Sequence, residues 1–585
     1  MNFLKKYICE LVFAINIFLI VPNHDFKIWW QRPIVNDAMG YYAYLPAVFI
    51  YHDLTYNSIE EPWLKHNKDV PGGSNFKASF IVKYKGKEVN KYPPGVTYFQ
   101  APFFFAAHAC ALLFNAEPDG YSDIYMWFMC VGAIFWQYIF FKLIWRIFQH
   151  YNLSRTAFAI TVPILSFGTN LYFYTQMFGS YSHLYTLISV SLFFYSGLKF
   201  FENFPNTKSS KYFFVMVNAL ALAIITRNLN GIAIALLPCM GFKAKEVLNY
   251  FSILKNKLAL SGFILSFAIL FSMLYLWKLQ SGYWLIDSYP DEHFNWGKPQ
   301  IFKSLFSAHK GWFFYTPIAL VALFGFFYAP RKLSRNILFM LALVIYITSS
   351  WGCWDYGTGF SMRAYIDWYL IIALGLGFLI HHALHKKTYI YILTFLLVIL
   401  TSLNILWSEQ FLRGIISGTS QGIEYSIKNF FRLRPVLEFQ VSKRTIEKNV
   451  FVRNEFNEDP QHPYADVSEK IQFSKGMDVM LDDYLKDNSY TTIRFGGKAK
   501  LADLKNQIFL CASLTSDKDS LIIWQQIDIL FFPVVNEWEK LESGFQIPKN
   551  LPPHCRLKVF FWEPKGNTVA QIDDMYVEFV KATGE

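Results

Sequence analysis

The residues that could do chemistry are one carboxylate and three cations, which lie between or at the ends of long apolar runs. The carboxylate is Asp37, which follows the first apolar run in the segment VNDAMGYY at 35–42. The cations are Lys91, Arg227 and Arg363. A carboxylate can take a proton from a hydroxyl group, and fixed cations can stabilise the negative charge of a phosphate. These residue types predict a site for chemistry at a phosphate.

Three of these four residues, Asp37, Lys91 and Arg227, also have a structural interpretation. Asp is a favoured N-cap, so Asp37 could cap a helix that begins directly after it. Lys91 could anchor the chain at a membrane boundary, because a Tyr follows it, and Arg227 could extend its side chain from a helix end towards water. Arg363 has glycine-rich neighbours, which leave room for a ligand. The sequence leaves these alternatives open.

Four further residues are candidate substrate contacts: Tyr41, Tyr42, His183 and Asp355. A structural histidine is the alternative for His183, since it stands at the start of an apolar run. The seven cysteines show no CxxC spacing, and the adjacent residues 291–293 (Asp-Glu-His) cannot all face one ion on regular backbone. We therefore expect no cofactor, while a divalent metal remains compatible with the chemistry.

The elements that must position these residues are helices in a membrane. Of the 585 residues, 54% are hydrophobic, 19% aromatic and only 17% charged, which is far from the balance of a soluble protein. Long runs with few charges indicate that lipid is the solvent for much of the chain. The apolar runs predict about eleven spanning helices, at roughly 7–22, 122–147, 157–175, 182–201, 212–226, 231–242, 258–279, 311–329, 336–350, 366–382 and 388–407.

The basic residues predict the orientation of these helices. They gather at every second connection, which the positive-inside rule assigns to the cytoplasm. The first run lacks a small-residue cleavage site, so we interpret it as a retained helix with a cytoplasmic N-terminus. We expect a multi-pass protein of the cell inner or plasma membrane, with the candidate site and the C-terminal region outside. The basic residues are Lys142, Arg146, Arg155, Lys208, Lys211, Lys243, Lys245, Lys255, Lys257, Arg331, Lys332, Arg335, Lys386 and Lys387.

One more apolar run, 96–114, would reverse this orientation if it crossed the membrane. It contains Pro102 and His108, and an acidic segment follows it at 116–120. A crossing here would move every later basic connection outside, against the positive-inside rule. We therefore expect an interfacial or re-entrant helix within a large outer loop, 23–121.

After about residue 407 the composition changes and predicts a second domain. Charged residues and Asn become more frequent, and short alternating runs typical of strands appear. Turn signals separate them, as in a sandwich or jelly roll. We expect a membrane domain at 1–407, an interfacial connector at 408–444 and an all-β domain at 445–585. The expected strands include Thr491–Phe495, Gln507–Leu514, Leu521–Trp524, Arg556–Trp562 and Ala570–Phe579.

The order of these elements resembles the type C glycosyltransferases, multispanning enzymes that use polyprenyl-phosphate sugars as donors. The resemblance covers roughly Met1 to Trp407. In that superfamily an acidic residue soon after the first helix acts as base, and Asp37 matches it in type and place. A Lys-Pro-Pro-like element further along the same loop carries a Lys that faces the lipid phosphate. The segment KYPP at 91–94 is similar, with a Tyr interposed.

Two further likenesses accompany the first. The Trp- and Gly-rich segment 351–363 resembles an outer segment of uncharacterised bacterial relatives, from which no activity can be carried over. The last expected strands, at 560–562 and 572–576, resemble the ends of carbohydrate-binding jelly rolls. The superfamily's frequent acidic pair is here Asn36-Asp37, so one carboxylate is expected to serve alone.

The resemblance implies an inverting hexosyl or pentosyl transferase with a polyprenyl-phosphate sugar donor and a glycan, lipid or protein acceptor, at the outer face. Asp37 would then be the base, while Lys91, Arg227 and Arg363 would bind the donor phosphate. No nucleic-acid partner is expected. A lipid-linked-sugar transporter or flippase is one rival, which should show two related halves and a polar site in mid-membrane. A non-catalytic scaffold with a sugar-binding domain is the other, and it would tolerate loss of Asp37.

Overall fold

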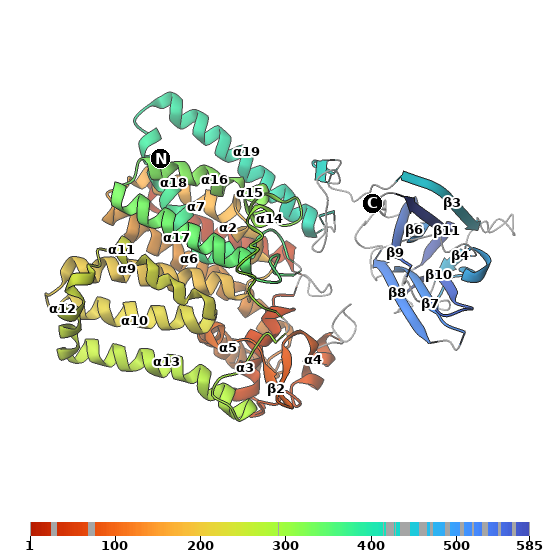
Figure 1. The fold of residues 1–585 in the computed structure, drawn as a ribbon, viewed down its shortest axis with the longest axis horizontal. Helices are drawn as coiled ribbons and strands as arrows, with labels where there is room; N and C mark the ends of the chain where they lie inside the picture. Colours follow the sequence, from red (N-terminus) through yellow and green to blue (C-terminus); the bar gives the residue numbers. More distant parts are fainter. Residues whose placement is uncertain are drawn as a thin grey trace. The chain divides into compact units, whose positions relative to one another are not determined.

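The structure is a computed structural model, and it divides into two compact units. The helical unit is Met1–Phe411 with Ser417–Ser426, and the strand unit is Leu412–Ile416 with Ile427–Glu585 (Figure 1). The residues that it describes are 2–24, 32–67, 77–290, 292–357, 359–412, 415–416, 426–427, 429–432, 445–454, 465–467, 472–485, 492–502, 508–517, 520–528, 536, 538–547, 551–563 and 569–583.

The helical unit is built of α-helices, short 3-10 helices and one small hairpin. The α-helices are α1 (Asn2–Lys6), α2 (Ile8–Asn23), α3 (Asp37–Phe49), α4 (Glu60–Asn67), α5 (Gly95–Leu113), α6 (Asp123–His150), α7 (Arg155–Phe167), α8 (Leu171–Gln176), α9 (Ser182–Asn203), α10 (Ser209–Thr226), α11 (Leu237–Met240), α12 (Val247–Phe251), α13 (Lys257–Ser281), α14 (Ile301–Phe306), α15 (Trp312–Tyr315), α16 (Pro317–Leu323), α17 (Arg331–Ser350), α18 (Tyr369–Ala383) and α19 (Lys387–Leu412). The 3-10 helices are η2 (Lys77–Ser79), η3 (Asn228–Leu236), η4 (Ala244–Glu246), η5 (Ser252–Lys255), η6 (Phe324–Phe327) and η7 (Arg363–Trp368). The hairpin is β1 (Ile81–Tyr84) with β2 (Lys87–Asn90).

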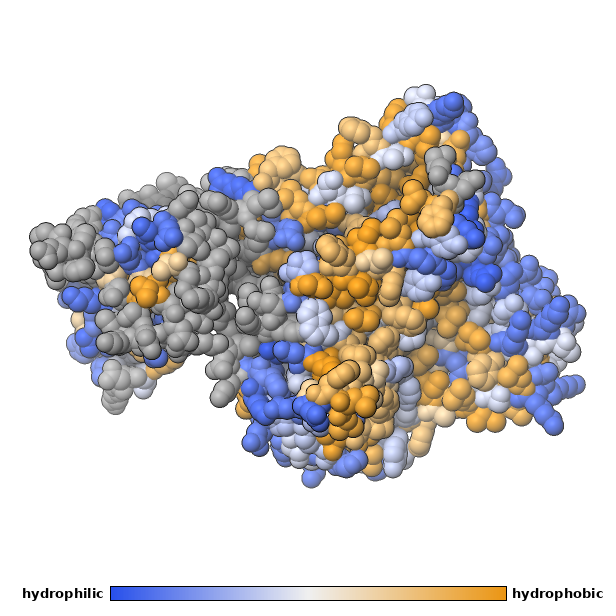
Figure 2. All heavy atoms as spheres, turned by 180° about the vertical axis from the view of Figure 1, so that it is seen from behind, coloured by the Kyte–Doolittle hydropathy of each residue, from blue (hydrophilic) through white to orange (hydrophobic). Residues whose placement is uncertain are grey.

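Eight helices in the described part of the chain are long and apolar enough to cross a membrane. They are α5, α6, α9, α10, α13, α17, η7 joined to α18, and α19. Shorter apolar segments of 10–17 residues are α2, α7, η3 with α11, and α16 with η6. Hydrophobic side chains form a broad band over the helical unit, with hydrophilic side chains towards its ends (Figure 2). The chain is therefore a multi-pass membrane protein with a β-sheet region at its C-terminus.

The expected short span at 231–242 is formed by η3 and α11. A 3-10 helix rises roughly 2.0 Å per residue, so η3 and α11 together reach about 24 Å, against about 20 Å for an α-helix of the same length. They run from Arg227, which caps the end of α10, to the last turns of α9, where the Phe242 and Phe201 rings lie 5.8 Å apart. The stretched geometry lets a short apolar segment run the length of its neighbours.

The segment 96–114 forms a single helix, α5, which packs along the first half of α6. A Cβ on its first residue, Gly95, would meet the backbone of Thr226, the last residue of α10. Towards its other end, His108 Nδ1 lies 2.6 Å from the hydroxyl of Tyr125, in the first turn of α6. In Figure 1 it lies beside α3 and α4, while α12 lies at the opposite end. Helix α5 is thus long and apolar enough to cross a membrane, and whether it does so stays a prediction.

Helix α3 and the β1–β2 hairpin pack closely, which fixes Asp37 relative to Lys91. A Cβ at Gly40 would come within 2.3 Å of the Tyr92 ring, so only glycine allows this approach. The Asn90 amide donates to the Gly40 carbonyl at 2.7 Å, and the Tyr44 hydroxyl donates to the Tyr92 carbonyl at 2.7 Å. The start of α3 and the end of the hairpin therefore form one rigid piece.

The strand unit consists of two antiparallel sheets. One sheet has the order β5-β10-β7-β8, and the other has the order β3-β11-β6-β9 with β4 also paired to β11. The five strands expected from sequence are present, while β3, β4, β5 and β9 were not expected. Of the expected connector 408–444, α19 covers the first part, and most of the remainder lies outside the described residues. The strands are β3 (Thr445–Asn454), β4 (Ala465–Val467), β5 (Met477–Met480), β6 (Thr492–Leu501), β7 (Phe509–Thr515), β8 (Leu521–Asp528), β9 (Trp538–Gln546), β10 (Arg556–Trp562) and β11 (Ala570–Thr583).

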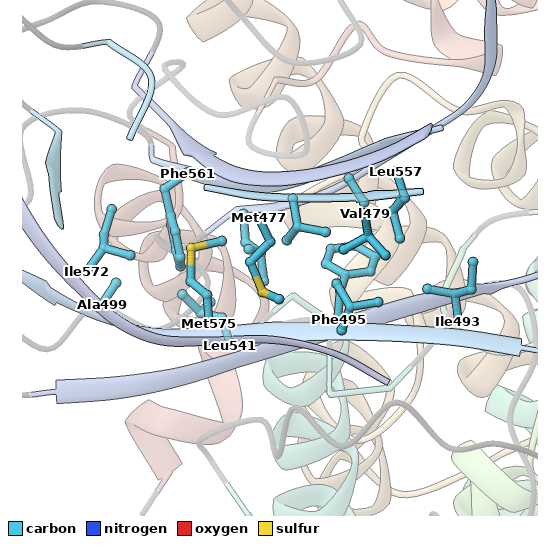
Figure 3. Close-up of a cluster of buried hydrophobic side chains, with 14 of the residues drawn as sticks. Met477, Val479, Ile493, Phe495, Ala499, Leu541, Leu557, Phe561, Ile572 and Met575 are labelled. Carbon is cyan, nitrogen blue, oxygen red and sulfur yellow. The ribbon is translucent and has the colours of Figure 1, made fainter. Parts of the chain in front are cut away.

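A hydrophobic core fills the space between these two sheets (Figure 3). Alternate residues of β10, Leu557, Val559 and Phe561, are fully buried, while Arg556 and Lys558 between them are exposed. Residues of β5 and β10 face those of β6, β9 and β11, including Phe495 and Leu541. The period of two predicted in this strand is thus the inside–outside alternation of a sandwich.

Candidate functional site

A cavity of about 380 Å³ lies in the helical unit and gathers side chains from segments far apart in sequence. It collects the start of α3, the end of the hairpin, the start of α9, the end of α10, and residues near 290 and 355. Six of the residues proposed from sequence line it: Asp37, Tyr41, Lys91, His183, Arg227 and Arg363. Its other lining residues are Tyr92, Pro93, Ser182, Thr226, Asn228, Leu229, Ser288, Tyr289, Glu292, Phe294, Trp351, Cys353, Tyr356 and Gly357.

Asp37 and Arg363 form an ion pair in the wall of this cavity. Arg363 Nη2 lies 2.8 Å from Asp37 Oδ2 and also donates to the Tyr356 carbonyl at 2.6 Å. The Nε and Nη1 atoms of Arg363 are buried and have no hydrogen-bond partner among the described residues. A buried guanidinium with open donors is costly unless an acceptor is supplied, so this arrangement is suited to an anionic ligand.

The Asp37 carboxyl is held in its ionised form. Burial raises its pKa, but the charge of Arg363, a hydrogen bond from Tyr92 and the charge of Lys91 together lower the pKa below its usual value. Asp37 is the first residue of α3, and the N-cap is Asn36, which makes no side-chain capping bond. The Asp37 side chain is therefore placed at the cavity by the helix rather than serving as its N-cap.

Lys91 lies across the cavity wall among aromatic rings. Its Nζ is 5.2 Å from the Tyr92 ring centre and 5.7 Å from that of Tyr289. Rings at this distance attract a cation without neutralising it. The Lys91 ammonium group thus keeps its charge for a ligand, and the flat rings around it offer faces on which a sugar could stack.

A second buried carboxylate, Asp367, supports Arg227 and His183. Its Oδ1 lies 2.8 Å from His183 Nδ1, while its Oδ2 accepts from Arg227 Nη1 at 3.0 Å and from the Asn230 amide at 2.8 Å. The Arg227 guanidinium carbon also lies 5.6 Å from the Tyr356 ring centre. The cavity thus has two Arg–Asp pairs, one built on Asp37 and one on Asp367.

The segment that carries Arg363 is fixed by contacts beneath it. A Cβ at Gly359, whose φ is 155°, would meet the Tyr174 hydroxyl at 2.7 Å, and this hydroxyl donates to the Phe360 carbonyl at 3.1 Å. The buried Lys310 ammonium donates to the Gly359 carbonyl. Burial, with a smaller contribution from the charge of Arg363, lowers the pKa of Lys310 to about 7. A glycine and a buried lysine therefore set the path of this loop.

Two of the candidate substrate contacts lie away from the cavity. The Tyr42 side chain is buried on the other side of α3, where its hydroxyl donates to the Gly120 carbonyl at 2.6 Å. Asp355 accepts from the Cys353 thiol at 3.3 Å and lies 3.7 Å from His309 Nε2. Residues one position apart on a helix face different directions, which explains why Tyr41 lines the cavity and Tyr42 does not.

Sequence reasoning missed Asp367, Tyr92, Tyr289 and Tyr356. Asp367 was the one that carried a signal, because an acidic residue in an apolar run is expensive unless it is paired. Outside the cavity, the described residues include one cluster with metal-ligand spacing, His66, Glu117 and Asp119. There Lys65 already pairs with Glu117 at 2.5 Å, so a cation occupies one of the three ligand positions.

Comparisons with known proteins were made for the whole chain. No family model matches it, and no curated protein sequence matches it. Among solved structures, the oligosaccharyltransferase of Archaeoglobus fulgidus in its apo form is similar, with a TM-score of 0.38 and 11% sequence identity. The match covers 74% of this chain and 61% of that protein, so the chain matches less than two thirds of its length.

Proposed function

We propose that the protein is a membrane glycosyltransferase that moves a sugar from a polyprenyl-phosphate donor to a hydroxyl acceptor at the extracytoplasmic face. Asp37 takes the acceptor proton as the bond between the sugar and the phosphate breaks. Lys91, Arg227 and Arg363 bind the phosphate, which leaves with the bonding electrons. The donor's apolar chain stays in the lipid.

The observation that carries this proposal is the convergence of the Asp37 carboxylate and three cations on a single cavity. These residues come from four separate segments, and Arg363 has two buried donors without a hydrogen-bond partner among the described residues. Arg363 Nη2 pairs with Oδ2 of Asp37, and each carboxylate oxygen has two lone pairs, so the carboxylate retains acceptor capacity for an incoming hydroxyl. Aromatic rings line the remaining wall and suit a sugar.

The proposed topology has eleven crossings. Seven of the eight long apolar helices, without α5, together with the four shorter apolar segments make this number. The exclusion of α5 rests on the basic connections, which would lie outside if α5 crossed the membrane. Lys142 pairs with Glu10 at 2.7 Å, and Arg155 binds the carbonyl of Lys5, so basic residues gather at the inner ends of α2 and α6.

We also infer a jelly-roll topology for the strand unit. One sheet has the order β5-β10-β7-β8, and it faces the other sheet, which has the order β3-β11-β6-β9. Most neighbouring strands in a sheet are not consecutive in the chain, and these pairs are antiparallel. Such crossing between the sheets is typical of two wound Greek keys. We place this unit outside the cell, on the same side as the cavity.

The test is a transfer assay with the purified full chain in lipid. It is incubated with a panel of radiolabelled polyprenyl-phosphate sugars and a membrane extract as the source of acceptors. We expect label to move from the donor to a new product with at least one sugar. Retention of all label on every donor, with the donors shown to bind, would contradict the proposed function.

A further inference from the structure

We propose that Asp367 is a positioning residue that fixes His183 in the tautomer whose Nε2 faces the cavity as a hydrogen-bond acceptor. Asp367 also holds the Arg227 guanidinium, which lies next to His183. The cavity wall then offers an acceptor beside a cation, a pair that fits a sugar hydroxyl close to a phosphate. This inference rests on the proposed function, because it takes the cavity as the substrate site.

Asp367 itself is placed to organise other residues rather than to contact a substrate. It is 1% exposed and does not line the cavity. Both of its carboxylate oxygens are engaged, Oδ1 with His183 and Oδ2 with Arg227 and Asn230. These partners come from the start of α9 and from the junction of α10 with η3, so one carboxylate ties three segments of the wall together.

The contacts around His183 Nδ1 determine which ring nitrogen carries the proton. Nδ1 lies 2.8 Å from Asp367 Oδ1 and 2.9 Å from Arg227 Nη1. A guanidinium can only donate, and an ionised carboxylate can only accept. Without a proton, Nδ1 would point its lone pair at the Asp367 carboxylate oxygen 2.8 Å away, and the two would repel each other. With the proton on Nδ1, both His183 and Arg227 donate to Asp367, and two donors approach each other at 2.9 Å. The charge-assisted bond to the carboxylate outweighs that approach, so the contacts favour a proton on Nδ1.

The other ring nitrogen of His183 then becomes the functional one. In a neutral imidazole with Nδ1 protonated, Nε2 carries a lone pair and accepts a hydrogen bond. His183 lines the cavity beside Arg227 and Tyr41. A ligand that gives a phosphate oxygen to Arg227 can therefore donate a nearby hydroxyl to Nε2. The wall thus selects donors that bear a hydroxyl on the sugar close to the phosphate.

The tautomer can be measured without any assay of transfer. Full-length protein in lipid is labelled with 15N-histidine, and the signals of His183 among the 13 histidines are identified by their loss in His183→Gln. We expect Nδ1 to be protonated and Nε2 bare in the wild type. We expect Asp367→Asn to move the proton to Nε2 or to mix the tautomers. The matched control is Asp119→Asn, which removes the carboxylate 2.5 Å from His66 Nε2 and should leave the His183 signals unchanged.

Two results would overturn the proposal. One is a proton on Nε2 of His183 in the wild type, a measurement that does not depend on whether Asp367→Asn folds. The other is an unchanged tautomer in folded Asp367→Asn.

In the transfer assay, wild type should prefer the natural donor over one monodeoxy donor by on the order of tenfold or more, since a lost hydrogen bond to a buried group costs about 1–3 kcal/mol. Asp367→Asn should lose that preference. Absence of transfer by the wild type would count against the proposed function alone, because the 15N spectra still decide the tautomer.

Discussion

At the residue scale, the Asp37–Arg363 pair links the electrostatics of the cavity to its chemistry. Replacing Asp37 by Asn keeps the shape of the side chain but removes its ability to take a proton. We expect Asp37→Asn to lower turnover by on the order of a hundredfold to ten-thousandfold without weakening donor binding. The measurements are initial transfer rates and a separate donor-binding titration. Asp53→Asn is the control, because Asp53 is a partly buried carboxylate outside the cavity, and its Oδ1 accepts from the Thr55 backbone N–H at 2.8 Å.

The pH dependence of the same group follows from its lowered pKa. The carboxyl of an Asp in an unfolded chain has a pKa of about 3.9, and the pKa of the Asp37 carboxyl in the folded protein is below its usual value. Asp37 therefore stabilises the fold above that pH, and this contribution is lost as the pH falls through the folded pKa. The carboxylate-dependent rate should stay constant from pH 8 to pH 5. A fall centred near pH 6 that disappears in Asp37→Asn would show that the Arg363 pair does not hold the carboxyl ionised.

The cations predict a different phenotype, a loss of donor affinity. Lys91→Gln or Arg363→Gln removes a charged donor to a phosphate in partly dry surroundings, which is worth about 1.5–3 kcal/mol. We expect donor affinity to fall by roughly tenfold to a hundredfold. Arg363→Lys should also weaken binding, because a single ammonium cannot replace the open Nε and Nη1 donors of the guanidinium.

The matched control for Lys91 lies in the same hairpin. Lys85 is exposed at the β1–β2 turn, and its Nζ lies 4.2 Å from the Tyr283 ring centre, so it also combines a cation with an aromatic face. Lys85→Gln should leave donor affinity unchanged. If Lys85→Gln and Lys91→Gln weaken binding equally, the effect is general surface charge, and Lys91 is an interfacial anchor.

At the element scale, the sequence predicted what composition and period determine and missed what depends on distant partners. Asp37 and Lys91 were recognisable because their types and positions are unusual for an outer loop. Asp367 carried a signal as an acidic residue in an apolar run, but its role did not, because its partners His183 and Arg227 lie 184 and 140 residues away and only folding brings them together. Strand β9 was missed because its period is obscured by charged residues such as Glu542, which is buried and bonds with Arg494 and Tyr576.

Helix α5 shows the limit of length and hydropathy as criteria. By length and by hydropathy, α5 qualifies as a membrane span. Its first residue contacts the last residue of α10, and His108 near its other end contacts the first turn of α6. We expect cysteines placed before and after it, Lys85→Cys and Pro118→Cys, to react equally with an impermeant reagent in intact cells, with the native cysteines replaced by Ser. Reaction at only one of the two positions would show that α5 crosses the membrane.

At the scale of the whole molecule, an apolar band separates two hydrophilic ends of the helical unit (Figure 2). The cavity lies at the end where α10 finishes and α9 begins, while α12 and its basic neighbours lie at the other (Figure 1). The positive-inside rule assigns the basic end to the cytoplasm. With the proposed eleven crossings, we expect the strand unit outside the cell.

Two exposed positions test this arrangement, Lys255 beside α12 and Ser520 at the start of β8. In a background without native cysteines, we expect Ser520→Cys to react with an impermeant maleimide in intact cells and Lys255→Cys to react only after the membrane is opened. Moving the charges of a basic connection across the membrane costs free energy, so Lys255 and its neighbours stay inside. Labelling of both positions in intact cells would require an even number of crossings after α12. It would contradict the proposed five crossings between Lys255 and the strand unit.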